Sequence, residues 1–585
     1  MDQTTTDPGD YTRLTTATDS VDNARLTPDP VDNARPTPTE TKTSKGWRFW
    51  LIFVCLALTA FLSALEGSIV STALPSIARA LNASEDYIWV VNVYYLTSAA
   101  VQPIYGQLAD LWGRRWLMIG AVALFTLGSG ICGGSTSTNM LIGGRTVQGL
   151  GAAGINSEHV LFANYTYKWL TQAFTVLIEL ILCDLLPLRE RGQFFGALFL
   201  FLILGSALGP FLGGILVDRV SWRWAFYINL PFGGASLVLL YFVLHVRHKP
   251  QGSVVDKLKK IDLFGNFLLA ASVSSVLYAL TYGGTRYNWS NAGIIASLVL
   301  GLVGHVLFLL FEASPLCRDP VMPLSLFKHR TSTAAFIATF LQTIVSFWAL
   351  FFLPLYFQSV KLVAPTRSGV LILPFTIIYS ISGLIGGGLA TKLGRFRIIH
   401  FAGFALITIG IGTFTLFERD THLAEIEVLQ VVFAFGIGIV APSLLTAIQA
   451  ALPDDLNAAS TGTFAFVRSI GTIWGVSIPA AIFNNRFDEL LQELPDETAR
   501  AALARGHAYE SASAAFVNSF PGPIRDMIVS IYERSLMRVW QIGIVFAGLG
   551  FLVVFLERDL ELRAEQESQE FGLEERQRVN RETTS

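Results

Sequence analysis

Apolar runs of about 20 residues constrain this chain more than any other feature of its sequence. A helix of about 20 apolar residues crosses a hydrocarbon layer about 30 Å thick. Because lipid offers the backbone no hydrogen bonds, each run is expected to be an α-helix. Charged residues make up 15% of the chain, against about 25% in soluble domains, so we predict an all-α polytopic membrane protein. The fourteen runs cover approximately residues 48–73, 87–108, 116–134, 139–184 (interrupted), 193–216, 224–245, 262–281, 291–312, 332–356, 367–390, 397–416, 425–448, 460–483 and 537–556.

Basic residues between the runs predict which way the chain faces. Cytoplasmic connections are richer in Lys and Arg than outer ones. The connections after even-numbered runs carry most of these residues, and an even number of runs places both termini on one side. We therefore predict two cytoplasmic tails, residues 1–46, which are disordered, and residues 557–585. The glycosylation sequons at Asn82 and Asn288 fall on the predicted outer side.

A short motif that occurs twice in the sequence divides the chain into two halves. The stretch "GQLADLWGRR" at 106–115 aligns without gaps to "GGLATKLGRF" at 387–396, and each lies between two apolar runs on the cytoplasmic side. Transporters are commonly built from two such related halves, with the substrate site between them. The predicted parts are a six-helix bundle over 47–246, a linker with two additional transmembrane helices over 247–330, and a second six-helix bundle over 331–556 that includes a long outer loop at 484–536.

The stretch at 106–115 resembles the signature of the loop between helices 2 and 3 in the major facilitator superfamily. Gly106 and Gly113 permit a tight turn and a close helix approach. Asp110 can pair with an arginine or cap a neighbouring helix N-terminus, and Arg114 and Arg115 complete the motif. The resemblance implies the major facilitator fold, in which these residues form a gate that favours one of two rocking states.

Other motifs narrow the resemblance to the fourteen-helix drug:proton antiporters, and in particular to fungal toxin and multidrug efflux pumps. They are "ALEGSIVSTALPSIARAL" at 64–81, "LIGGRTVQGLGAAG" at 141–154, "GSALGPFLGG" at 205–214 and "SWRWAFYINLPFGG" at 221–234. The third resembles the antiporter motif of helix 5, with regularly spaced glycines and a helix-kinking proline. The motif residues are Gly205, Gly209, Pro210, Gly213 and Gly214.

Four charged residues inside the apolar runs need a reason to be there, because a charge at mid-membrane costs several kcal/mol. Glu66 stands where the family usually has aspartate, and it is a candidate proton carrier; a structural hydrogen bond is the alternative. Arg145 resembles the family's coupling arginine and could pair with a carboxylate or meet substrate charge. Glu179 and Arg468 are weaker candidates, for which packing or gating is the simpler interpretation.

Residues 157–175 do not fit a membrane helix, because they bring Ser, Glu, His, Asn, Lys and Gln to membrane depth. Related pumps run directly from "GIN" to "LIE". We hypothesise a retained intron, since these 19 codons can encode a splice donor, a branch site and an acceptor. A genuine re-entrant insert is the alternative.

Together these features predict a proton-coupled secondary transporter that exports amphipathic small molecules, such as a toxin, secondary metabolite or drug, from the plasma membrane of a fungus. The alternatives are proton-coupled uptake of an iron chelate or nutrient, and a non-transporting membrane sensor. No nucleotide-binding loop, cofactor motif, metal-ligand cluster or nucleophile–base pair is evident, so an enzyme is not expected. A net charge of −2 argues against a nucleic-acid partner. A monomer is the default expectation.

Overall fold

The structure is a computed structural model. It describes residues 47–83, 86–112, 114–155, 188–243, 262–315, 317, 320, 322–453, 456–558 and 560. The chain divides into Met1–Gly46 and Trp47–Ser585, and every described helix belongs to the second unit. All of the first tail, nearly all of the second tail, the 157–175 segment and Glu179 lie outside the described residues.

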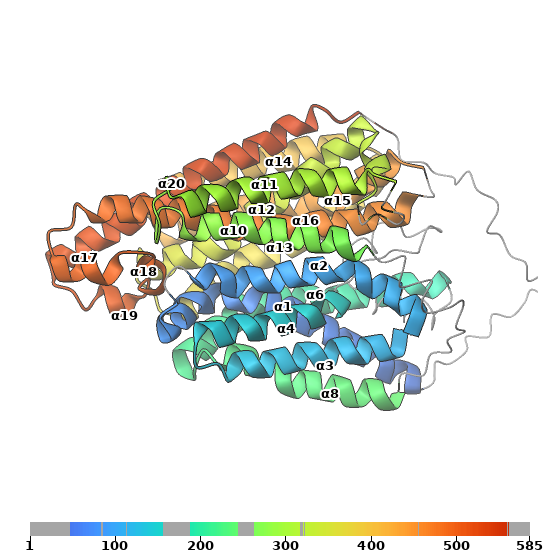
Figure 1. Ribbon diagram of the computed structural model, residues 1–585, viewed down its shortest axis with the longest axis horizontal. Helices are drawn as coiled ribbons and strands as arrows, with labels where there is room; N and C mark the ends of the chain where they lie inside the picture. The colour runs from blue at the N-terminus through green and yellow to red at the C-terminus, as the bar shows by residue number, and fades with distance from the viewer. Residues whose placement is uncertain are drawn as a thin grey trace, which may run out of the picture. The chain divides into compact units, whose positions relative to one another are not determined.

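Helices form almost all of the described chain, and no β-strand occurs in that part of it (Figure 1). This result confirms the all-α prediction. The helices before the linker are α1 (Trp47–Leu81), α2 (Tyr87–Trp112), α3 (Arg114–Gly133), α4 (Thr138–Ile155), α6 (Leu188–Arg219), α7 (Trp224–Tyr227) and α8 (Asn229–Val243). The linker contains α10 (Leu263–Tyr282), α11 (Ala292–Glu312) and the 3-10 turn η2 (Leu324–Phe327). The later helices are α12 (Arg330–Ser359), α13 (Pro365–Leu393), α14 (Arg397–Thr413), η3 (Phe414–Leu416), α15 (Leu423–Ala450), α16 (Asn457–Leu491), α17 (Glu497–Leu503), α18 (His507–Glu510), α19 (Ala514–Val517) and α20 (Gly522–Val554).

The long helices form two halves with the same pattern of neighbours. In the first half α1 packs on α6 and α8, α3 on α4 and α8, and α2 on α4. The second half repeats these pairs, as α12 packs on α16 and α20, α14 on α15 and α20, and α13 on α15. The halves meet along two seams, α2 against α16 and α6 against α13. This repetition is the arrangement that the sequence similarity between 106–115 and 387–396 implies.

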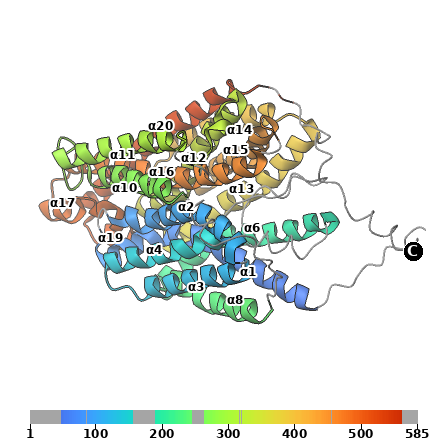
Figure 2. The ribbon, with the colours of Figure 1, turned by 45° about the vertical axis from the view of Figure 1, so that its right-hand side comes forward.

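The additional pair, α10 and α11, forms a hairpin beside one seam. The two helices pack on each other, and α10 also contacts α2 and α16 (Figures 1 and 2). Asp262 caps the start of α10 by accepting a hydrogen bond from the Gly265 amide, and Asn291 caps α11 through Gly293. The hairpin therefore borders the α2–α16 seam and leaves the α6–α13 seam without such a cover among the described helices.

Twelve described helices are long and apolar enough to cross a membrane. They match twelve of the fourteen predicted runs. The other two runs correspond to α2 and α4, which are helical but more polar; α4 carries Arg145 and Gln148, and its described part ends at Ile155. The count of fourteen spans therefore stays a prediction.

The helices of the bundle have two ends, which we call the cap end and the tail end. At the cap end α1 finishes and α2 begins; the tail end is where α1 starts and α20 finishes. The connection from α16 to α20 lies at the cap end and is shorter than the expected loop at 484–536, because α16 continues to Leu491 and α20 already begins at Gly522. The residues between them, 492–521, contain α17, α18 and α19.

Contacts at the cap end join the halves. The ring of Tyr87 on α2 stacks on Tyr509 of α18 with 3.9 Å between centroids. Arg79 of α1 donates a 3.1 Å hydrogen bond to Ser513. On the other seam Thr366 of α13 donates a 2.8 Å hydrogen bond to Asp218 of α6. The described contacts therefore close the cap end across both seams.

Candidate functional site

A buried carboxylate lies near the middle of α1. Glu66 is 0% exposed, and its Oε2 accepts a 2.6 Å hydrogen bond from Nδ2 of Asn229, the first residue of α8. Its Oε1 forms an ion pair with Nη1 of Arg145 on α4. Membrane helices retain charges at this depth where the charges have partners or a function. The fold thus joins the two proton-coupling candidates in one ion pair.

Arg145 is 1% exposed and is held by groups from two helices besides Glu66. Its Nε donates a 3.0 Å hydrogen bond to the carbonyl of Val90 on α2. Nη1 donates a 2.8 Å hydrogen bond to Oε1 of Gln148, one turn further along α4. The guanidinium carbon lies 4.3 Å from the centroid of the Tyr94 ring, which is a favourable cation–π distance.

A hydroxyl on α3 links the amides around the pair. Nε2 of Gln148 donates a 2.8 Å hydrogen bond to Oγ of Ser129, and Nδ2 of Asn229 lies 3.3 Å from the same oxygen. Side chains from α1, α2, α3, α4 and α8 therefore meet at one point inside the first half. We call the six residues Glu66, Tyr94, Ser129, Arg145, Gln148 and Asn229 the Glu66 cluster.

Glycines allow α4 to approach its neighbours closely enough to build this cluster. A Cβ on Gly151 would lie 2.2 Å from the amide nitrogen of Phe125 on α3, and one on Gly149 would lie 2.6 Å from the carbonyl oxygen of Tyr94 on α2. No side chain fits at either position without a shift of the neighbouring helix, because real Cβ atoms essentially never lie within 3.0 Å of such an atom. The "GGRTVQGLG" pattern thus brings Arg145 and Gln148 toward α1.

The two charges of the Glu66 cluster depend on each other. Removing one charge of a buried ion pair leaves the other uncompensated, at a cost of about 3–5 kcal/mol in comparable cases. A proton on Glu66 would leave Arg145 with only carbonyl, amide and ring partners. A proton on Glu66 would therefore weaken one of the contacts that hold these five helices together.

The glycines of the predicted antiporter motif lie on α6 against α1. A Cβ on Gly205 would lie 2.4 Å from the carbonyl oxygen of Phe61, and one on Gly213 would lie 2.3 Å from that of Ile69. At Gly209 the nearest atom would be Oγ of Ser68, at 1.9 Å. The motif thus lets α6 lie directly on the helix that carries Glu66.

The same motif also reaches the second half. A Cβ on Gly214 would lie 2.2 Å from the carbonyl oxygen of Pro365, the first residue of α13. A Cβ on Gly369 of α13 would lie 2.5 Å from the carbonyl oxygen of Pro210, which also accepts a 2.7 Å hydrogen bond from Thr72 of α1. The two motif positions Pro210 and Gly214 therefore lie in the α6–α13 seam, near the cap end.

The predicted gate motif is only partly described. Gly106 and Asp110 fall on α2, and Arg114 begins α3, but their side chains and Gly113 lie outside the described part. Arg115 donates a 2.6 Å hydrogen bond to the carbonyl of Tyr241 on α8. The pairing of Asp110 with an arginine stays a prediction.

The matched position in the second half shows the expected turn. Gly394, which aligns with Gly113, has a φ of 62° and ends α13. This left-handed conformation favours glycine.

The remaining candidates lie apart from the Glu66 cluster. Arg468 lies on α16, with its guanidinium carbon 5.7 Å from the Phe464 ring centroid, and it is not among the partners of Glu66 or Arg145. Asn82 and Asn288 are exposed and both lie at the cap end. The two asparagines thus lie at the same end of the bundle; that this end faces outward and that they carry glycans stay predictions.

Sequence reasoning missed four members of the cluster, Tyr94, Ser129, Gln148 and Asn229. A signal existed for two of them. Gln148 follows Arg145 by three residues, which places both on one helix face, and Asn229 is a lone amide in the apolar stretch "YINLPFGG". Ser129 gave no such signal, because a serine in a membrane helix usually bonds its own backbone.

One group of possible metal ligands forms at the tail end of the linker hairpin, where the sequence had given no sign of one. Oxygens of Asp262 and Glu312 and the sulfur of Cys317 lie within 4.8 Å of one another. Asp262 caps α10, and Glu312 accepts a 3.0 Å hydrogen bond from the Met322 amide. These bonds give both carboxylates a structural role.

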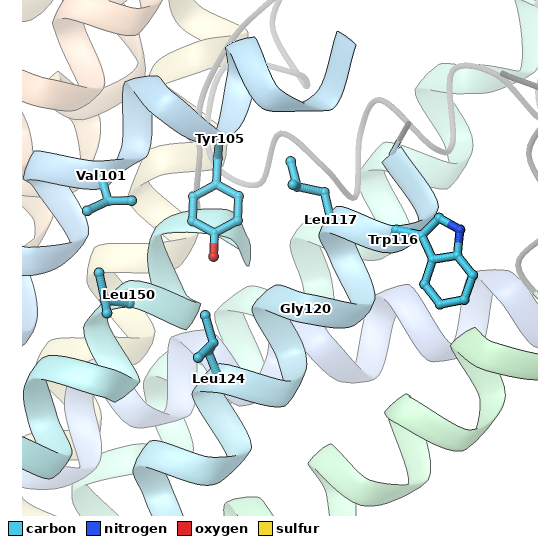
Figure 3. Close-up of a pocket in the computed structure, with 7 residues that line it drawn as sticks. All are labelled: Val101, Tyr105, Trp116, Leu117, Gly120, Leu124 and Leu150. Carbon is cyan, nitrogen blue, oxygen red and sulfur yellow. The ribbon is translucent and has the colours of Figure 1, made fainter. Parts of the chain in front are cut away.

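An apolar hollow of about 590 Å³ lies between α2, α3 and α4 (Figure 3). Tyr105 and Leu117 lie beside it, with Leu124 and Leu150 opposite them in the view (Figure 3). All of its lining residues belong to the first half, so it is not a site between the halves.

Comparisons with known proteins agree with this architecture. A sequence model described as the Major Facilitator Superfamily matches residues 56–166 and 169–476. The chain is 65% identical over 547 residues to the MFS-type efflux transporter pyiT of Pyricularia grisea, covering 91% of this chain and 88% of that protein. It is 47% identical over 545 residues to the MFS-type efflux transporter phmH of Phaeosphaeria nodorum, covering 92% and 90%.

A solved structure shares the fold. It is a bacterial homologue of the human lysosomal transporter Spinster in an inward-facing and occupied conformation, with a TM-score of 0.57, 16% sequence identity, and coverage of 88% of this chain and 97% of that one. With the family sequence match and the repeated six-helix pattern, the conclusion is that this chain is a multi-pass membrane protein that belongs to the major facilitator superfamily, a family of transporters and not of enzymes.

Proposed function

We propose that the protein is a proton-coupled secondary transporter that exports amphipathic small molecules by alternating access. The observation that carries the proposal is the buried ion pair of Glu66 and Arg145, which lies beside the antiporter motif on α6. The efflux named for the relatives from Pyricularia grisea and Phaeosphaeria nodorum supports the direction of transport. The cargo would be a fungal secondary metabolite, toxin or drug, and its export would confer resistance.

Charge supports the orientation within this proposal. The tail end carries the connections rich in Lys and Arg, so it faces the cytoplasm, and both termini lie there. The cap end, with Asn82 and Asn288, then faces outward. The protein would act as a monomer in the plasma membrane and carry glycans.

The proposed cycle uses Glu66 as the proton carrier. A proton from the outer side neutralises the carboxylate and releases its ion pair with Arg145. Return of the proton to the cytoplasm restores the pair. Substrate moves in the opposite direction because each state of Glu66 favours a different arrangement of the halves.

The test uses everted plasma-membrane vesicles with an acidic interior and no ATP. Nile red, an amphipathic fluorescent compound, is added, and proton release from the vesicles is followed. We expect Nile red to release protons from vesicles with the wild-type chain and not from vesicles with Glu66→Gln. Glu427→Gln is the matched control. Glu427 is a half-buried carboxylate on α15 bonded to Gln430 and lies outside the Glu66 cluster, so this variant should retain proton release.

Two outcomes contradict the proposal. Proton release that persists in Glu66→Gln would exclude Glu66 as the carrier. No release by the wild-type chain, with Nile red and a panel of lipophilic fungal metabolites, would contradict efflux when correct insertion has been shown. That result would favour proton-coupled uptake or a sensor.

A further inference from the structure

We propose that Tyr95 is the positioning residue through which the second half responds to the protonation of Glu66. The inference rests on the proposed proton coupling and adds to it the link between the Glu66 cluster and the moving half. It is based on the two faces of α2, the helix that lies between α4 and α16.

One face of α2 holds Arg145. The carbonyl of Val90 accepts its Nε, and the ring of Tyr94 lies under its guanidinium. Residues four apart on a helix share a face, so Arg145 contacts two successive turns of α2. A change in the Arg145–Glu66 ion pair would therefore alter contacts that Arg145 makes with this helix.

A neighbouring face of α2 meets the second half. Asn92 donates a 2.6 Å hydrogen bond to Oγ of Ser477 on α16. One turn later, the Tyr95 ring lies edge-on to Phe347 of α12, with 5.6 Å between centroids and an interplanar angle of 79°. A Cβ on Gly475 of α16 would lie 3.0 Å from Cβ of Phe347, so Phe347 is seated on α16 as well.

Tyr95 also reaches back to the helix that carries Glu66. Its hydroxyl donates a 2.9 Å hydrogen bond to the carbonyl of Gly67, the residue directly after Glu66. Gly67 has no side chain to cover this carbonyl, and a Cβ there would lie 3.5 Å from the hydroxyl. Tyr95 therefore touches α1 beside Glu66 with its hydroxyl and the second half with its ring.

These contacts form a short physical path. A proton on Glu66 weakens the ion pair with Arg145, which in turn alters the position of α2 relative to α1. The Tyr95 hydroxyl keeps its ring in register with the Gly67 turn, so the edge contact with Phe347 is favoured in one state of Glu66 and not in the other. Among the described residues, the charged or titratable side chains that face Glu66 are Arg145 of α4, Tyr94 and Tyr95 of α2, and Cys132 of α3.

The test separates the proton site from the response of the halves. The full chain, with its four cysteines replaced by serine, is reconstituted in lipid nanodiscs. Infrared difference spectra between acidic and alkaline buffer follow the protonated carboxyl band of Glu66, which is assigned by its loss in Glu66→Gln. Spin labels on Thr136→Cys and Asp420→Cys report the distance between the halves. These exposed positions occupy matched connections at the cap end, α3–α4 and α14–α15.

Tyr95→Phe removes the hydroxyl and keeps the ring, and Phe347→Leu removes the ring partner. We expect both variants to keep the Glu66 band. The pH-driven change in the population ratio of the short and long label-to-label distances should shrink about fivefold, the effect of one hydrogen bond or ring contact of ordinary net strength. Tyr105→Phe is the matched control. Tyr105 is also on α2, but its ring packs on Gly154 within the first half, so its response should equal that of the wild type.

The possible outcomes are distinct. A full distance response in Tyr95→Phe, or loss of the Glu66 band in that variant, would overturn the role of Tyr95 as the link. A wild-type protein in which the band does not titrate, or in which the distance ignores pH, would instead refute the proton coupling on which the inference rests.

Discussion

Gly213 and Gly214 are neighbours on α6, but their missing side chains face different halves of the molecule. A Cβ on Gly213 would lie 2.3 Å from the Ile69 carbonyl oxygen and 2.7 Å from Oγ1 of Thr72, both on α1. For an ordinary contact α1 and α6 would have to separate by about 1 Å. Forced overpacking of this kind costs about 1–3 kcal/mol, so we expect Gly213→Ala to destabilise the first half.

Gly214→Ala should act differently. Its Cβ would lie 2.2 Å from the carbonyl oxygen of Pro365, which belongs to the second half. The halves can separate at this seam without unfolding, so the variant should favour an open cap end and leave the thermal stability closer to that of the wild type. The two adjacent alanines therefore separate fold stability from the equilibrium between states.

Thermal unfolding of the purified protein, followed by tryptophan fluorescence, measures the first effect. The Thr136–Asp420 label distance measures the second. Gly234→Ala on α8 is the control, because no atom lies within 4 Å of its Cβ position. The packing argument fails if Gly213→Ala has the same melting temperature as Gly234→Ala, or if Gly213→Ala and Gly214→Ala change the melting temperature and the label distance alike.

Charge and sequence lead to three further expectations. The hydrogen bond from Arg534 holds the pKa of the exposed Glu493 carboxyl below its ordinary value, so its stabilising effect is present above the unfolded-state pKa and is lost as the pH falls through the folded-state pKa. Melting temperatures of wild type and Glu493→Gln should therefore converge in acid, and a difference independent of pH would contradict this. Asn82→Gln and Asn288→Gln should each remove one glycan, so each variant should migrate faster than the wild type on gels, and enzymatic deglycosylation should abolish this difference. Unchanged migration of both variants would show that neither asparagine carries a glycan. Complementary DNA across residues 157–175 should lack all 19 codons, and a transcript that retains them would refute the intron hypothesis.

The fold could be predicted because a membrane helix is recognisable from the composition of its own short segment. The length of each run, the basic connections and the motif repeated at 387–396 can each be read from short segments of sequence. Together they implied two related bundles and an inserted pair. The ends of α16 and α20 could not be placed in the same way. Both helices continue past the apolar run into polar segments, where packing against residues 492–521 and not hydropathy decides where they end.

The candidate site was predicted in part for a similar reason. Glu66 and Arg145 stand out because an isolated charge in an apolar run is conspicuous. Their pairing depends on how α1 and α4 meet, which is set by contacts such as Gly151 against Phe125. Tyr95 gave no signal, since an aromatic residue in a membrane helix is ordinary until its hydroxyl partner on another helix is known.

The α10–α11 hairpin makes the two seams unequal toward the surrounding lipid. Because α10 lies along α2 and α16, a lipophilic compound dissolved in the bilayer meets a helical wall on that flank. The opposite flank, between α6 and α13, has no such wall in the described structure. Among the described helices the two sides of the fold are therefore unequal. If the protein exports a membrane-dissolved cargo as proposed, that cargo would approach the space between the halves from the flank that carries Pro210 and Gly214.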